Sequence, residues 1–251
     1  MRQMDLNCDM GESPEAIADG TQEALMKWLT SANIACGGHA GDAVTMEATI
    51  RQAMKHNLAI GAHPGYPDRE NFGRLELNMS SREVSDFVFA QVTALDEIAK
   101  RLRAKISHVK PHGALYNQAV RNKELARAIA AGVARWRRGV TLVGLADSPM
   151  LDVFRNAGFP VAAEAFADRR YETDGTLRSR KFADALIRDP EQAGKQAVAI
   201  ATQNSLTAYG GTLLEVNAQT LCIHGDTPGA ARIAAAVRKA LAEAGVPVAP
   251  R

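Results

Sequence analysis

The sequence is poor in aromatic residues, and it has neither a run of basic residues nor an apolar stretch long enough to cross a bilayer. Phe, Trp and Tyr make up 5% of the 251 residues, and the formal net charge is only +2. Few aromatic rings and no clustered positive charge argue against nucleic acid as the main partner. A membrane-spanning helix needs about 20 consecutive apolar residues. We therefore expect neither a nucleic acid nor a membrane partner.

Cysteine is also scarce. Cys8, Cys36 and Cys222 are widely spaced and form no Cys-x-x-Cys motif. An odd, scattered set of this kind argues against a disulfide framework or a zinc ribbon. The chain begins MRQMDLNCD, without the charged and then apolar segment of a secretory leader. These features lead us to expect a cytoplasmic protein with reduced thiols.

Short apolar runs alternate with longer segments of helical periodicity from one end of the chain to the other. The runs that we expect to form strands are Met4–Cys8, Ala32–Cys36, Leu58–Ala62, Ile106–Lys110, Val140–Leu145, Val161–Phe166 and Thr220–His224. Helix signals lie between them, such as the capping box from Ser80 to Glu83 and the helix start at Asp189-Pro190. Because no Pro/Gly/Ser-rich linker interrupts this alternation, it predicts a single domain over residues 1–251 with a parallel sheet.

The strand count favours a closed barrel. The count of about seven strands is close to the eight of the common α/β barrel, so we predict a single-domain (β/α)7-type, TIM-like barrel. The competing architecture is a doubly wound open sheet. No Gly-x-Gly-x-x-Gly or Walker-type loop follows any expected strand, which weakens the nucleotide-binding versions of that sheet. The polar, arginine-rich segment 167–181 is expected to be a long loop over the active site.

Polar residues recur at the C-terminal ends of the expected strands, where the active sites of parallel barrels lie. In the first strand Asp5, Asn7 and Asp9 alternate with apolar residues, and inward-facing polar groups are unfavourable unless they meet partners or a ligand. Five of the six histidines also fall at strand ends, whereas His56 lies at a helix end. The residues on which we expect catalysis to depend are Asp9, His39, His63, Lys110, His112 and Glu164.

Plainer interpretations remain open for individual residues. Asp42 is read as a helix cap, and the cysteines are read as small core residues. A divalent metal site is a further possibility, because Asp9, His39 and His63 come from three successive strand ends and form a suitable ligand set. No His-x-x-x-His motif supports such a site.

Longer motifs resemble the LamB/YcsF family over nearly the whole chain. They are DLNCDMGE (5–12), SANIACGGHAGD (31–42), GAHPGYPD (61–68), HVKPHGALYN (108–117), EAFADRRY (164–171), DGTL (174–177) and HGDTP (224–228). The chain departs from the usual family pattern at Gly38, where a phenylalanine is common, and at Ser13-Pro14-Glu15. These departures leave the identity of the lactam substrate open.

The resemblance implies a β/α barrel similar to those of sugar deacetylases, and the role of the A subunit of a bacterial-type 5-oxoprolinase. Together with subunits B and C, such a protein opens the lactam of 5-oxo-L-proline to L-glutamate, while ATP, used with Mg²⁺, is hydrolysed to ADP and phosphate. On this basis the residues expected to bind substrate or phosphate are Asn7, Glu12, Asn33, Asn117, Arg169, Arg180, His224 and Asp226. Two alternatives stay open: a metal-dependent deacetylase-like hydrolase of amides or sugars, and a non-catalytic lactam-binding subunit. No loop matches a known ATP cradle, so the sequence leaves open which subunit binds ATP.

Overall fold

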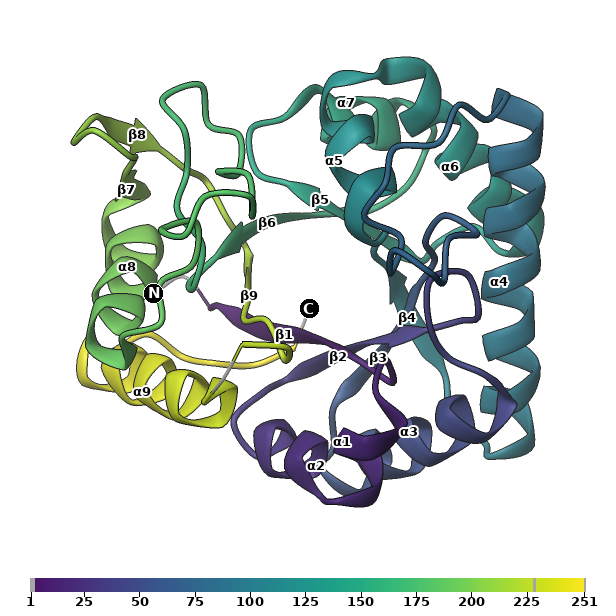
Figure 1. Cartoon of the computed structure of the whole chain (residues 1–251), viewed down its shortest axis with the longest axis horizontal. Coiled ribbons are helices and arrows are strands. Elements are labelled where there is room, and N and C mark those ends of the chain that lie inside the picture. Colours follow the sequence, from purple (N-terminus) through teal and green to yellow (C-terminus); the bar gives the residue numbers. More distant parts are fainter. Residues whose placement is uncertain (1–2, 228, 251) are drawn as a thin grey trace.

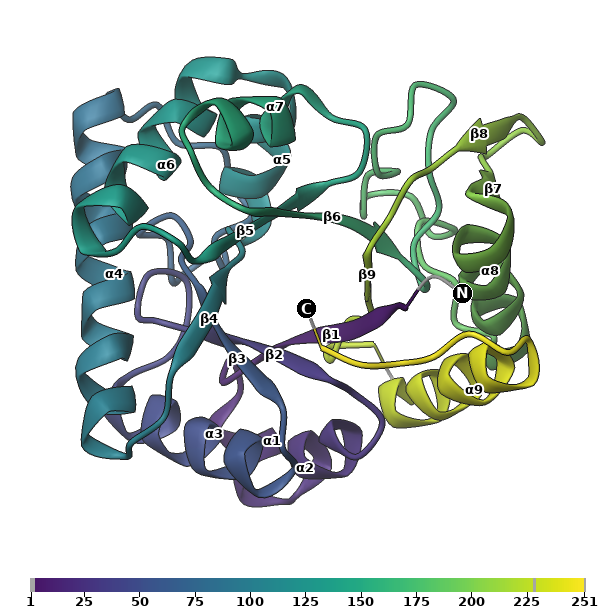
Figure 2. The same ribbon diagram turned by 180° about the vertical axis from the view of Figure 1, so that it is seen from behind.

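A computed structural model describes residues 3–227 and 229–250, and it arranges seven parallel strands as one closed barrel (Figures 1 and 2). Around the barrel the strand order is β1-β2-β3-β4-β5-β6-β9, and β9 pairs with β1 to close it. The strands are β1 (Asp5–Met10), β2 (Ser31–Ala35), β3 (Ala59–His63), β4 (Ile106–Val109), β5 (Thr141–Leu145), β6 (Val161–Phe166) and β9 (Thr220–Cys222). The predicted TIM-like barrel is confirmed, and the open sheet is wrong for this chain.

Each predicted strand lies in the barrel, with ends that differ by up to two residues. The first strand continues to Met10, two residues beyond the predicted end, and therefore includes Asp9. The sequence pattern missed a short antiparallel hairpin outside the barrel, formed by β7 (Ser205–Thr207) and β8 (Leu213–Glu215). Strands of three residues are too short to show a clear alternation of polar and apolar side chains.

Helices surround the barrel, with α4 and α6 packed side by side on one side and α8 and α9 on another (Figure 1). They are α1 (Pro14–Ala18), α2 (Thr21–Met26), α3 (Ala43–Lys55), α4 (Ser81–Arg101), α5 (Gly113–Arg121), α6 (Lys123–Trp136), α7 (Pro149–Asn156), α8 (Pro190–Gln203) and α9 (Ala230–Glu243). The predicted caps are confirmed: Ser80 and Glu83 form a capping box, and Asp189 and Asp42 accept backbone N–H groups. Within the described residues, no helix is both long and apolar enough to cross a membrane.

The two faces of β1 show how the sequence divides the interior. Leu6 and Cys8 are fully buried in the apolar core. The side chains of Asp5, Asn7 and Asp9 point into the barrel interior, where each forms a hydrogen bond with a polar side chain of the neighbouring strand β2. The predicted alternation along the first strand is therefore confirmed.

A long irregular segment connects β6 to α8. Residues 167–189, which include the predicted loop 167–181, form no helix or strand. Isolated antiparallel bridges join Arg169 to Leu186 and Tyr171 to Leu177, so the segment folds back on itself.

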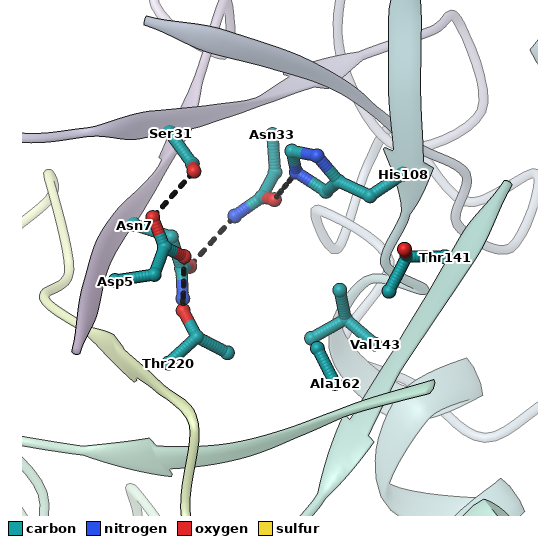
Figure 3. A pocket seen from close by; sticks show the side chains of 9 residues that line it. All are labelled: Asp5, Asn7, Ser31, Asn33, His108, Thr141, Val143, Ala162 and Thr220. Carbon is teal, nitrogen blue, oxygen red and sulfur yellow. Dashed lines mark hydrogen bonds between the residues drawn. The ribbon is translucent and has the colours of Figure 1, made fainter. Parts of the chain in front are cut away.

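A small cavity of about 10 Å³ lies inside the barrel, toward the N-terminal ends of the strands (Figure 3). Its lining mixes polar side chains with the apolar Val143 and Ala162, and on the polar side the carboxylate of Asp5 accepts hydrogen bonds from the hydroxyls of Thr30, Ser31 and Thr220. A space of this size is about that of one water molecule. His108 also lines the cavity, and its imidazole lies against Gly61 of β3, where a Cβ atom would come within 2.1 Å of Nε2. Gly61 therefore makes room for His108.

We predict that Gly61→Ala destabilises the protein by about 1–3 kcal/mol, the usual range for overpacking a core. The added methyl collides with the His108 ring, so its effect should shrink in a His108→Ala background. Urea denaturation of the wild type, both single variants and the double variant measures this coupling. Equal effects of Gly61→Ala in both backgrounds would contradict the assigned contact.

Candidate active site

The side chain of Lys110 lies at the centre of the polar interior. Lys110 follows β4 directly, and its Nζ lies 2.8 Å from Oε1 of Glu164 on β6 and 3.0 Å from Oδ1 of Asp9 on β1. It also donates to Oδ1 of Asn7 and to the sulfur of Cys222, at 3.2 and 3.1 Å. Lys110 and Glu164 are almost fully buried. An ion pair in this environment is maintained only when each charge has a partner.

Two asparagines orient this charged group. Asn33 donates from Nδ2 to Oδ1 of Asp9 and to Oδ1 of Asn7, both at 2.8 Å. Asn7 in turn donates from Nδ2 to Glu164. The Nδ2 group of Asn33 faces the Asp9 carboxylate, so the opposite side of the Asn33 amide presents Oδ1. This oxygen accepts a hydrogen bond from Nε2–H of His108, 2.8 Å away. His108 thereby positions Asn33, which positions Asp9.

Three histidines and Glu12 form a second cluster beside Asp9. The rings of His39 and His112 stack with centroids 3.5 Å apart, and His63 meets both edge-on. Oε1 of Glu12 lies 3.0 Å from Nε2 of His39 and 3.3 Å from Nδ1 of His112. Nε2 of His63 lies 3.2 Å from Oδ2 of Asp9. One carboxylate therefore joins the Lys110 group to the histidines.

The electrostatics of the site follow from burial and from these contacts. Burial alone would lower the pKa of Lys110, but Asp9 foremost, with Cys222 and Glu164, outweighs it and raises that pKa well above its ordinary value. Burial would likewise raise the pKa of Asp9, but His63 and Lys110 hold it well below its usual range. At neutral pH Lys110 is therefore cationic and Asp9 anionic.

Burial dominates at two other groups. It raises the pKa of Glu12, aided by Asp9 and opposed by His112. It also lowers the pKa of His108 to about 4, so this imidazole is neutral at neutral pH.

A third group lies beside the Lys110 group, where β6 and β9 end. Nδ1 of His224 lies 2.9 Å from Oδ1 of Asp168, and the His224 ring stacks on Phe166. Nζ of Lys110 lies 5.5 Å from the centroid of Phe166, within cation–π range. The hydroxyl of Tyr116 is buried, and burial together with Glu164 raises its pKa well above the ordinary value. Phe166 thus links His224 to the Lys110 group.

Three loops meet at the rim through one carboxylate. Oδ2 of Asp226 accepts from Arg74 at 2.6 Å and from Arg180 at 2.7 Å. Burial opposes and Arg180 favours the ionised form, and the pKa of Asp226 falls to about 2. Arg74 follows β3 and Arg180 lies in the irregular segment after β6, so Asp226 ties these loops to the one after β9.

The predicted catalytic residues share one network of contacts, although their roles stay predictions. It links Asp9, His39, His63, Lys110, His112 and Glu164. Asn7, Asn33 and Glu12 lie inside this network, and His224 and Asp226 lie at its rim. Arg169 is buried and donates from Nη2 to the carbonyl of Arg178. Asn117 is exposed on α5, in contrast to the buried cluster.

The predicted metal ligands Asp9, His39 and His63 overlap only in part with the side chains whose ligand atoms lie closest together. The ligand atoms that lie within 4.8 Å of one another belong to Glu12, His39, His63 and His112. His39 and His63 belong to both sets, and Asp9 lies beside this group with Oδ2 3.2 Å from Nε2 of His63, so the predicted ligand set stays a prediction.

Sequence reasoning left His108 and Arg74 out of the site. His108 alternates with Lys110 and His112 along one face of the chain, and this was a usable signal. Arg74 had none, because its contact with Asp226 spans 152 positions of sequence.

Comparison with known proteins gives matches along the full chain. A model of the LamB/YcsF family matches residues 4–251. The A subunit of 5-oxoprolinase from Chloroflexus aggregans is 50% identical over 248 residues, covering 99% of this chain and 98% of that protein. The crystal structure of the lactam utilization protein from Thermus thermophilus is 41% identical with a TM-score of 0.91, covering 98% of this chain and 99% of that one.

A more distant structural neighbour shares the fold alone. A family 4 carbohydrate esterase from Streptomyces lividans has a TM-score of 0.51 at 12% identity, covering 98% of this chain and 91% of that one. Its likeness supports the barrel architecture.

We predict that stability falls as the pH drops from about 6.5 to about 4, partly because of His108. In the unfolded chain His108 takes up a proton near its ordinary pKa, whereas in the folded chain it does so only near pH 4. The unfolded state therefore binds more protons in this window, and this group alone contributes a loss of up to roughly 3 kcal/mol. Denaturant unfolding at a series of pH values should show a shallower decline for His108→Gln than for the wild type. Parallel pH profiles would show that His108 is not the group responsible.

Proposed function

The chain belongs to the LamB/YcsF family, and from this membership we propose that it is the A subunit of a 5-oxoprolinase, which opens 5-oxo-L-proline to L-glutamate while ATP is hydrolysed to ADP and phosphate. The observation that carries this proposal is the buried Lys110 ammonium between Asp9 and Glu164, in a chain 50% identical over its length to a protein of that name. The relative's name designates one component of a complex, and we propose that the partners are subunits B and C.

The proposed reaction needs ATP because a five-membered lactam is a stable amide. Transfer of the terminal phosphate of Mg²⁺-bound ATP to the lactam oxygen makes the carbonyl carbon electrophilic. Water then adds to this carbon, the C–N bond breaks, and the ring nitrogen takes up a proton. A second water releases phosphate from the resulting acyl phosphate and leaves glutamate. The sum is one lactam, one ATP and two waters converted to glutamate, ADP and phosphate.

The residues of the site suit the charges that this chemistry creates. Lys110 is a fixed cation in a buried position, where it stabilises negative charge on oxygen more strongly than it would in water. Asp9 contacts both Lys110 and His63, so its ionised carboxylate is placed to orient the His63 imidazole beside the Lys110 cation. Arg180 at the rim is placed to receive an anionic group, since arginine binds carboxylate and phosphate with paired donors.

The decisive test is reconstitution of the purified chain with subunits B and C. Glutamate and ADP are followed with 5-oxo-L-proline and Mg²⁺-ATP as substrates, and each component is then omitted in turn. We expect glutamate and ADP in equal amounts, and neither when this chain is left out. Glutamate formed without ATP would instead favour a hydrolase that acts alone. Unchanged activity of the complex without this chain would overturn the proposal.

We predict that Lys110→Ala lowers the rate of glutamate formation by the complex by about 100-fold or more, the usual effect of removing one group that stabilises charge in a transition state. Lys110→Met, which keeps most of the buried volume, should lose activity equally, and circular dichroism should show that the variants remain folded. Lys195→Ala is the matched control, because Lys195 is exposed on α8 and pairs with Glu191. Normal activity of a folded Lys110→Ala variant would remove Lys110 from the site.

A further inference from the structure

The histidine cluster offers metal-ligating atoms from four separate segments of the chain. Glu12 follows β1, His39 follows β2, His63 ends β3, and His112 caps α5. One ligand atom from each lies within 4.8 Å of the other three. All three histidines are buried, and Glu12 is only 15% exposed. Polar groups this close together and shielded from water need a partner that satisfies them.

Two backbone carbonyls decide where the protons of His63 and His112 lie. Nδ1 of His63 is 2.7 Å from the carbonyl oxygen of Lys110, and Nε2 of His112 is 2.8 Å from that of Phe72. A carbonyl oxygen accepts hydrogen bonds and donates none, so both of these nitrogens carry the ring hydrogen. In the neutral form of each ring the opposite nitrogen, Nε2 of His63 or Nδ1 of His112, therefore presents a lone pair.

These two lone pairs face each other at 3.0 Å, and the atoms around them are also acceptors. Oδ2 of Asp9 lies 3.2 Å from Nε2 of His63, and Oε1 of Glu12 lies 3.3 Å from Nδ1 of His112. Neutral rings and ionised carboxylates would leave this centre with acceptors only. Either a second proton on Nε2 of His63 or a metal cation at the centre removes the conflict, and the outer carbonyls hold both rings in the orientation that metal-ligating histidines require.

The backbone around the cluster is shaped for close approach of the rings. A Cβ atom on Gly65 would lie 2.6 Å from Nδ1 of His39. A Cβ atom on Gly73 would lie 2.7 Å from Cβ of His39 and 3.0 Å from Cδ2 of His112. Both positions therefore admit only glycine, and this allows the two rings to stack at 3.5 Å.

We propose that Glu12, His39, His63 and His112 bind one divalent transition-metal ion of the Zn²⁺ class. Three imidazole nitrogens and one carboxylate oxygen are a ligand set typical of such ions, and unlike that of Mg²⁺ or Ca²⁺. The inference rests on the proposed function only in that both concern the same mouth of the barrel. Asp9, which contacts both His63 and Lys110, places the ion beside the Lys110 group, where it would polarise an oxygen of a bound substrate.

Metal binding is tested on the full chain, stripped with a chelator and titrated with Zn²⁺ alone by calorimetry. We expect one equivalent per chain with a submicromolar Kd. Outer-sphere partners of metal sites affect affinity by about 10–100-fold, so loss of a ligand in Glu12→Gln, His63→Gln or His112→Gln should weaken binding by about 100-fold or more. His56→Gln is the control, since His56 pairs with Glu23 at the end of α3 and should bind Zn²⁺ as the wild type does.

Co²⁺ supplies a second readout that is independent of activity. Its visible absorption should appear with the wild type and with His56→Gln, and should be lost in the ligand variants, whose folding is checked by thermal melting. No saturable uptake by the wild type, or uptake that the three ligand variants leave unchanged, would overturn the inference. Turnover of the reconstituted complex is assayed on the same samples. Turnover without metal binding refutes the metal site alone, whereas metal binding without turnover refutes the proposed function alone.

Discussion

A buried charge balance between Lys110, Asp9 and Glu164 is the constraint on which the interior of the barrel depends. The side chains of Lys110 and Glu164 are 3% and 0% exposed, so neither charge is solvated by bulk water. Removing one member of such a group leaves a buried charge without its partner, which typically costs about 3–5 kcal/mol. Asn7 and Asn33 share the remaining hydrogen-bonding capacity of the carboxylates. The fold and the candidate site are therefore built from the same residues.

The two oxygens of Asp9 face different clusters. Oδ1 receives hydrogen bonds from Lys110 and Asn33, and Oδ2 lies against His63. Asp9 therefore couples the charge of the histidines to that of Lys110 electrostatically. In a buried site this coupling is strong, because little solvent screens it.

Much of this arrangement could be predicted from local sequence patterns. Alternation along the first strand assigned Asp5, Asn7 and Asp9 to the inside of the barrel, and the same reasoning placed Lys110 at a strand end. What the patterns could not supply was pairing between distant segments. Asp226 with Arg74 is one such pair, and Glu12 with the histidines is another. Glu12 lies on a turn that has no period from which a direction can be read.

Exposure rises steadily from the floor of the candidate site to its rim, so the rim is the side that faces solvent. Lys110 is 3% exposed, Asp9 13%, Arg180 27% and Arg74 45%. The surface ion pairs at the rim are individually weak, because water and salt screen them. The charges deeper in the barrel are held by one another, because Lys110 pairs with both Asp9 and Glu164 away from bulk water.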